Sequence, residues 1–367
     1  MSKQKYLSMK NHLHYRLIIV CLFLTLPSFV YSQSDVSGLM KSSPADASKL
    51  AQAYLKPLFK GLGVGLNSGW NNSAHSKNLL RFDLRFGITG AVVPQPDESF
   101  DITKIGLSNN IRPTNPAQTI TSTLSGSKDN NTQLTVYDDN NQALESFTLP
   151  GGTGIGLIPA PQLQGSIGLS RGIELSLRAM PTVKLGSEFG SIGMFGGGIK
   201  VELIPLISGM ADKILPIDLA VAAGYTRFTY EVPLNVPAPS NALPSSPTQS
   251  NNFSNQRVEA QFSGINTEFI VSKRILLFTP FISLGYNTAK TDVGMKGNYP
   301  IIDGVTPFGQ RTYTVFTDPI NIKQTDINGF RTNIGFQLNL AFFRIYGSYS
   351  MAEYNSFNGG LGFGLGK

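Results

Sequence analysis

The sequence has one cysteine, few charged residues and, beyond its first segment, no long hydrophobic run. Cys21 lies in an apolar run that we expect to be removed, so the mature chain can form no disulfide, thiolate metal site or cysteine nucleophile. Charged residues make up 14% of the chain, against about 25% in soluble proteins. The lack of a second stretch of about 18 apolar residues excludes membrane-spanning helices.

Residues 1–32 have the pattern of a secretory signal peptide. Lys3, Lys5, Lys10 and Arg16 precede an apolar run over residues 17–26, which is too short to span a membrane as a helix. Cleavage after Ser32 would leave 26 basic and 23 acidic residues, a net charge of +3. A charge this small gives no indication of nucleic-acid binding.

The mature sequence alternates between apolar and polar residues over many short segments. Even positions from 80 to 88 are Leu80, Phe82, Leu84, Phe86 and Ile88, while the odd positions begin with Arg81, Asp83 and Arg85. Residues 334–342 repeat the pattern with apolar even positions. Such alternation places one face of a strand against lipid and the other in a lumen, and only a closed barrel satisfies its backbone in lipid without helices.

We therefore predict an all-β fold, a transmembrane antiparallel up-and-down β-barrel over residues 61–367. Eleven strands are evident, the first at residues 62–70. Because single-chain barrels need an even number, we expect one more strand within residues 94–160, about 12 in total with a range of 10 to 14. The breaks at 170–172, 272–274 and 341–344 are short, as periplasmic turns are. The stretches 94–160, 233–253 and 293–323 are expected to be large extracellular loops.

Residues 33–60 are predicted to form an N-terminal helical segment. Ser43 can cap a helix with Pro44 at its first position and Asp46 in its first turn, running to about Lys56. This helix is either a plug or lid of the lumen or a helix resting on the barrel rim.

Projecting the strands inward gives a set of candidate lumen residues: Arg81, Asp83, Arg85, Glu174, Arg178, Lys200, Glu202, Asp218 and Glu268. Opposed charges can line a pathway for a polar solute. They can equally form a network of ion pairs that fills a narrow barrel. The sequence predicts no catalytic residue, no cofactor and no metal site.

Several segments resemble an uncharacterised family of Gram-negative outer-membrane β-barrels, a domain of unknown function. They are Gly69-Trp70-Asn71, Arg81-Phe82-Asp83, the stretch from Pro150 to Gln162, and Gly168 to Leu175. The resemblance covers nearly the whole mature chain and implies a barrel. In layout, the segment before the barrel and the large outer loops are loosely similar to the long-chain fatty-acid transporter family, whose plugged barrels pass hydrophobic ligands.

We expect a protein of the outer membrane of a Gram-negative bacterium that contacts membrane lipid and the barrel-assembly machinery, and no nucleic acid. The first hypothesis is a passive channel or transporter for a small polar or hydrophobic solute. The alternative is a closed structural or surface-interaction barrel without transport. A weaker alternative, a lipid-modifying enzyme, would require His75, the only histidine of the mature chain.

Overall fold

The computed structural model describes residues 43–364 except 139, 171, 187–188, 208–215 and 307, all within one compact unit, Ser37–Lys367. The predicted signal peptide, residues 1–32, lies outside the described residues. Among those that are described, no helix has the length and apolar character needed to cross a membrane.

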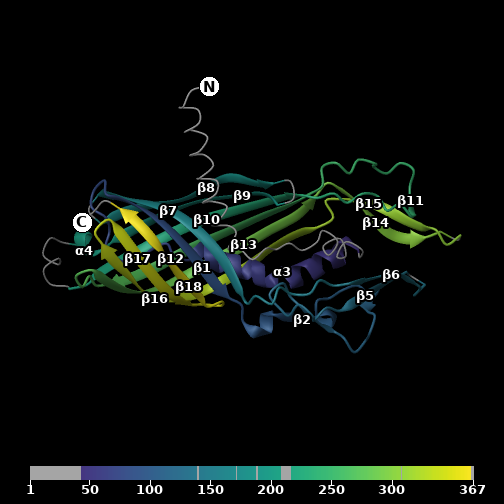
Figure 1. The fold of residues 1–367 in the computed structure, drawn as a ribbon, viewed down its shortest axis with the longest axis horizontal. Coiled ribbons are helices and arrows are strands. Elements are labelled where there is room, and N and C mark those ends of the chain that lie inside the picture. Colours follow the sequence, from purple (N-terminus) through teal and green to yellow (C-terminus); the bar gives the residue numbers. More distant parts are fainter. Residues whose placement is uncertain are drawn as a thin grey trace, which may run out of the picture. The chain divides into compact units, whose positions relative to one another are not determined.

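Ten antiparallel strands close into a barrel in which each strand pairs with the next along the chain and β1 pairs with β18 (Figure 1). They are β1 (Phe82–Val92), β7 (Leu157–Ser170), β8 (Ile173–Gly186), β9 (Gly190–Glu202), β10 (Asp218–Pro233), β12 (Arg257–Ser272), β13 (Phe278–Lys296), β16 (Asn321–Leu340), β17 (Phe343–Met351) and β18 (Ser356–Gly364). The predicted closed up-and-down antiparallel barrel is confirmed.

The two ends of the barrel differ in their connections. At the short-turn end, β7 is joined to β8, β12 to β13 and β16 to β17 by brief turns, and β1 begins and β18 ends there. Residues 203–217, with the short helix α4 (Ile204–Ile207), connect β9 to β10 at the same end. At the opposite, long-loop end lie the connections 93–156, 234–256 and 297–320.

Small sheets fold within these long connections. The 93–156 connection contains η1 (Gln95–Asp97), β2 (Ser99–Asp101), η2 (Ile102–Lys104), β3 (Ile111–Pro113), β4 (Ile120–Ser122), β5 (Gln133–Tyr137) and β6 (Ala143–Thr148). β2 pairs with β4, and β5 pairs with β3 and β6. The other two connections form a sheet of β11 (Ala242–Pro244), β15 (Arg311–Thr317) and β14 (Asn298–Val305).

Alternation along the strands separates an apolar exterior from a polar interior. In β1, Leu84 and Ile88 are exposed while Asp83, Arg85 and Thr89 are buried. In β12, Ile265 and Phe269 are exposed while Asn266 and Glu268 are buried. Period-two alternation in the sequence thus identifies both faces of the wall.

The helix α3 (Pro44–Asn67) precedes the barrel. Its predicted start is confirmed, because the Ser43 hydroxyl accepts a hydrogen bond from the Asp46 amide and Pro44 follows the cap. Its predicted end near residue 56 was wrong, and so was the strand predicted at residues 62–70, since the helix continues to Asn67.

The expected twelfth strand within 94–160 is also absent from the described barrel wall, because that connection folds into its own small sheets until β7 begins at Leu157. Ten strands lie at the lower limit of the predicted range and two below its central value.

Candidate functional site

The barrel lumen is filled by residues 44–79, which we call the plug segment. Its helix α3 contacts β1 and β7 on one side of the barrel and β10, β12, β13 and β16 on the other. At its N-terminal end, Asp46 accepts hydrogen bonds from the amide and hydroxyl of Ser108 in the long-loop connection. At the opposite end, the Leu80 amide donates to the Gly168 carbonyl near the short turn of β7. The plug segment therefore passes through the barrel from one mouth to the other.

Glycines let α3 approach the wall more closely than any other residue would. A Cβ atom at Gly65 would lie 2.3 Å from the Ala160 Cβ, and one at Gly63 would lie 2.6 Å from the Ala289 Cβ. Real Cβ atoms do not come this close to another carbon. The helix and the wall fit together at van der Waals contact only because these positions carry no side chain.

Three buried arginines of the wall, Arg85, Arg178 and Arg331, bind the C-terminal end of α3 and the residues just after it; we call them the arginine cluster. Arg178 donates to the carbonyls of Leu66 at 2.9 Å and Ser68 at 2.6 Å. Arg331 donates to the Asn67 carbonyl at 2.7 Å. Arg85 donates to the Trp70 carbonyl at 2.8 Å. The end of a helix leaves carbonyls unpaired and carries partial negative charge, so buried cations are well suited to hold it.

Trp70, the only tryptophan of the chain, lies just beyond the helix. The Arg178 guanidinium stacks on its ring at 3.8 Å, a cation–π contact. The ring fills the space beside Gly198 and Gly224 of neighbouring strands. Its fluorescence therefore reports whether the plug segment is in place.

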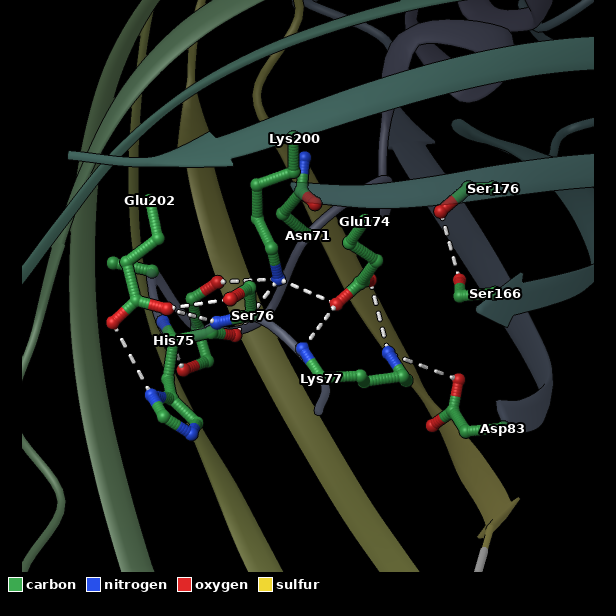
Figure 2. Close-up of polar contacts among 12 residues, drawn as sticks. Asn71, His75, Ser76, Lys77, Asp83, Ser166, Glu174, Ser176, Lys200 and Glu202 are labelled. Carbon is green, nitrogen blue, oxygen red and sulfur yellow. Dashed lines mark hydrogen bonds and ion pairs between the residues drawn. The ribbon is translucent and has the colours of Figure 1, made fainter. Parts of the chain in front are cut away.

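Beyond Trp70, the irregular part of the plug segment binds buried charges near the short-turn end (Figure 2). Glu174 of β8 is 1% exposed and lies 2.9 Å from the Lys77 ammonium and 3.1 Å from that of Lys200. Lys77 also lies 3.6 Å from Asp83. Burial lowers the pKa of Lys77, while Glu174 and Asp83 oppose this change. One ion-pair network thus connects the plug segment to β1, β8 and β9.

His75 lies at the short-turn mouth beside two carboxylates. Its Nδ1 is 3.3 Å from Glu202 Oε1 and 3.9 Å from Asp218 Oδ1. The hydrogen bond to Glu202 raises the pKa of His75. We call His75, Glu202 and Asp218 the rim cluster. The Ser76 hydroxyl donates to Glu202 at 2.6 Å rather than to the imidazole, so this serine and histidine are not arranged as a nucleophile and its base.

Seven of the nine predicted lumen residues are buried inside the barrel. They are Asp83, Arg85, Glu174, Arg178, Lys200, Glu202 and Glu268. Asp218, the first residue of β10, is half-buried at the mouth. Arg81 is a correction: its side chain is exposed, because the left-handed backbone of Leu80, with φ 59°, interrupts the extended chain before β1 begins.

Sequence reasoning missed Arg331, Lys77 and Arg344. Arg331 lies two positions before the inward-facing Asn333, so extending the alternation backward along β16 would have found it. Arg344, whose guanidinium is 2.5 Å from Asp83, follows a short turn. No sequence pattern indicated that Lys77 faces the lumen, because the irregular chain around it lacks the alternation of a strand.

Asp97 holds α3 at the long-loop end. Its carboxylate accepts hydrogen bonds from Lys56 at 2.5 Å and from the Tyr354 hydroxyl at 2.6 Å. Burial acts to raise the pKa of Asp97, but these hydrogen bonds and the lysine charges outweigh it and lower the pKa from its ordinary 3.8.

We expect this attachment to weaken in acid. A depressed pKa stabilises the fold at pH values above 3.8, and this stabilisation is lost as the pH falls through the lower folded-state pKa. For a partly exposed pair the contribution is about 1 kcal/mol or less. Below about pH 4, the protection of residues 44–60 against hydrogen exchange, measured relative to the intrinsic exchange rate at each pH, should fall. Asp97→Asn should show the faster exchange at neutral pH, whereas Asp101→Asn, which alters a half-buried acid paired with the exposed Lys104, should not. Equal exchange in Asp97→Asn and the unmodified chain would contradict the assignment.

Residues 9–365 match a family of unknown function, DUF6588. The chain belongs to this family. No curated protein matches it.

Among solved structures, the chain is similar to outer-membrane β-barrels. For the outer membrane protease OmpT of Escherichia coli the identity is 9% and the TM-score 0.31, covering 79% of this chain and 99% of that one. For Ail of Yersinia pestis the identity is 8% and the TM-score 0.25, covering 78% of this chain and 99% of that one. For the toluene transporter TodX of Pseudomonas putida the identity is 8% and the TM-score 0.27, covering 83% of this chain and 74% of that one. At these values the similarity carries no inference about the activity of this member of DUF6588.

Proposed function

We propose that this protein is a gated passage for small polar solutes in the outer membrane of a Gram-negative bacterium, opened by displacement of the plug segment. The observation that carries the proposal is that the lumen is filled by a segment that contributes no strand to the wall.

The exterior of the wall supports a membrane location. Large apolar side chains are exposed on outward positions all around the barrel, including Ile88 at 45%, Leu284 at 57% and Phe357 at 58%. Contiguous exposed apolar surface of this kind is typical of a face that contacts lipid.

The wall and the plug segment are separable in their backbone bonding. β1 pairs with both β7 and β18, so the ladder is complete without residues 44–79. Phe59, Val64 and Leu66 of α3 pack in apolar clusters with the wall. Toward the short-turn end the plug segment is held by side chains of the arginine cluster and by ion pairs. These polar contacts can be exchanged for water and solute when the plug segment moves.

The nature of the solute follows from the side chains that displacement would uncover. Toward the short-turn end the wall carries Asp83, Glu174, Lys200 and the arginine cluster. Charged groups of both signs around a water-filled lumen favour passage of polar solutes over apolar ones.

The test is single-channel conductance in a planar bilayer. We expect the intact chain to be closed most of the time and Arg178→Ala/Arg331→Ala to show steady conductance steps. The double variant leaves the Ser68 and Asn67 carbonyls without these donors, at a cost of about 1–3 kcal/mol each. Since about 1.4 kcal/mol is a factor of ten, the open fraction should rise at least about tenfold.

Arg227→Ala is the matched control, because Arg227 of β10 is exposed on the outer face and binds Gln261 rather than the plug segment. It should conduct no more than the intact chain. Silence of the double variant, with the barrel folded by circular dichroism and hydrogen exchange of residues 58–67 accelerated as for a displaced plug, would sink the proposal and leave a closed structural barrel.

A further inference from the structure

We propose that the rim cluster is a binding site for a divalent transition-metal ion that bridges the plug segment to the barrel wall. The site goes beyond the gated passage proposed above, and its test does not depend on conduction. The proposal rests on the three ligand atoms, the orientation of the two carboxylates, and the charge around them.

The three ligand atoms come from three elements that meet at the short-turn mouth. His75 belongs to the plug segment, Glu202 is the last residue of β9 and Asp218 is the first residue of β10. His75 Nδ1, a Glu202 oxygen and an Asp218 oxygen all lie within 4.8 Å of one another. Ligands of a tetrahedral zinc ion are separated by about 3.3 Å, because each lies about 2.0–2.1 Å from the metal. Small side-chain rotations reach that geometry.

Each carboxylate is oriented by a serine that occupies one of its oxygens. Ser76 donates to Glu202 Oε2 through its amide at 2.7 Å and its hydroxyl at 2.6 Å, which leaves Oε1 facing His75. The Ser272 hydroxyl contacts Asp218 Oδ2 at 3.4 Å, and the other oxygen, Oδ1, faces His75. Metal ligands are commonly held by such outer hydrogen bonds, which fix the direction of the coordinating atom.

The charge around the site favours a cation. Within the described part of the chain, the ion pairs of Glu174 and Asp83 are with lysines and arginines, whereas Glu202 and Asp218 make an ion pair only with His75. Lys200 is the nearby cation, but its ammonium contacts Glu174 and the carbonyls of Ser73 and His75. A divalent ion bound to two carboxylates and a neutral imidazole forms a neutral unit, which suits the burial of Glu202.

The site is reachable and leaves coordination positions for water. The His75 side chain is 53% exposed and that of Asp218 26%, whereas that of Glu202 is 5% exposed. An ion can thus enter from solution at the short-turn mouth. Imidazole with carboxylates is a donor set that zinc and its neighbours in the first transition row accept.

Zinc binding to the full chain tests the site. After treatment with a chelator, the detergent-solubilised protein should bind one Zn²⁺ per chain in a calorimetric titration. His75→Ala and Asp218→Asn should each weaken binding by about 100-fold or more, because the first removes the imidazole ligand and the second removes the charge of a carboxylate ligand. Asp292→Asn, which alters an exposed acid paired with Lys323 at the long-loop end, should leave binding unchanged.

A second measurement separates a bridging site from a surface site. Zn²⁺ should slow hydrogen exchange of residues 68–79 in the intact chain and have no such effect in His75→Ala. Because His75 is half-exposed, its replacement should leave the barrel folded, which circular dichroism checks. Absence of zinc binding, or binding of one ion that survives both ligand variants, would overturn the proposal.

Discussion

Glu174→Gln is expected to destabilise the folded protein by about 3–5 kcal/mol, the usual cost of removing one partner from a buried ion pair. Glu174 is 1% exposed between Lys77 and Lys200, and the side-chain exposures of these lysines are 15% and 6%. Glutamine keeps the volume but removes the charge, which leaves two ammonium groups buried without their principal counter-ion. The measurement is guanidinium unfolding in detergent, followed by the fluorescence of Trp70.

Two further variants identify the cause of that loss. Glu174→Gln/Lys200→Met should be less destabilised than Glu174→Gln alone, because it removes one of the uncompensated charges. Glu259→Gln, in an exposed pair with Arg257, should change the unfolding free energy by less than about 1 kcal/mol. A Glu174→Gln variant as stable as the intact chain would mean that these charges are solvated rather than buried.

Gly65→Ala is expected to displace α3 from the wall, although alanine favours helix formation over glycine by about 1 kcal/mol. The new Cβ would lie 2.3 Å from the Ala160 Cβ, on a strand that pairs with β1 at this position. Overpacking of this kind costs about 1–3 kcal/mol. Hydrogen exchange of the 58–67 region should accelerate by about tenfold or more, since about 1.4 kcal/mol corresponds to a factor of ten.

The contact offers its own compensating change. In Gly65→Ala/Ala160→Gly the methyl group moves from the wall to the helix, and the next atom of residue 160, its Cα, is 3.8 Å away. This double variant should regain the slow exchange of the intact chain. Gly165→Ala, on the same strand but in open space, should have no effect. If the single and double variants exchange at the same rate, the close approach of Gly65 to Ala160 is not what positions the helix.

The strands of the barrel wall could be predicted from the sequence because the two-residue alternation of their side chains is a property of the extended backbone. In β1 the contrast between Leu84 and Asp83 follows directly from the alternation of side chains in a strand. The start of α3 was equally local, since Ser43 and Pro44 act on the first turn of the helix whatever surrounds it.

The error in strand number has one origin. Leu62, Val64 and Leu66 alternate with glycines 61, 63 and 65, which has the period of a strand and the composition of a poor helix. The structure makes these residues helical because the glycines are needed where α3 contacts the wall. Without 62–70, the eleven apparent strands become ten, and the even number requires no hidden strand.

The sequence placed charges in the lumen but not their partners. Arg178 and Arg331 bind backbone carbonyls of the plug segment. Every residue has a backbone carbonyl, so residue identity does not indicate which one an arginine binds. No partner of His75 could be predicted, because Glu202 and Asp218 are distant along the chain and meet it only through the path of residues 68–79. Which side chains meet across the lumen depends on the tertiary structure, and the alternation along a single strand does not predict it.

The path of residues 44–79 through the lumen also constrains the order of assembly. These residues enter at the long-loop mouth and leave at the short-turn mouth, where they continue into β1. The wall closes by pairing β1 with β18, the first and last strands of the chain. Closure must therefore either enclose a segment already lying between the strands or be followed by threading of that segment through a finished ring. Threading would carry Asp46 and the lysines of α3 past the buried charges of the lumen, so enclosure during closure is the less costly route.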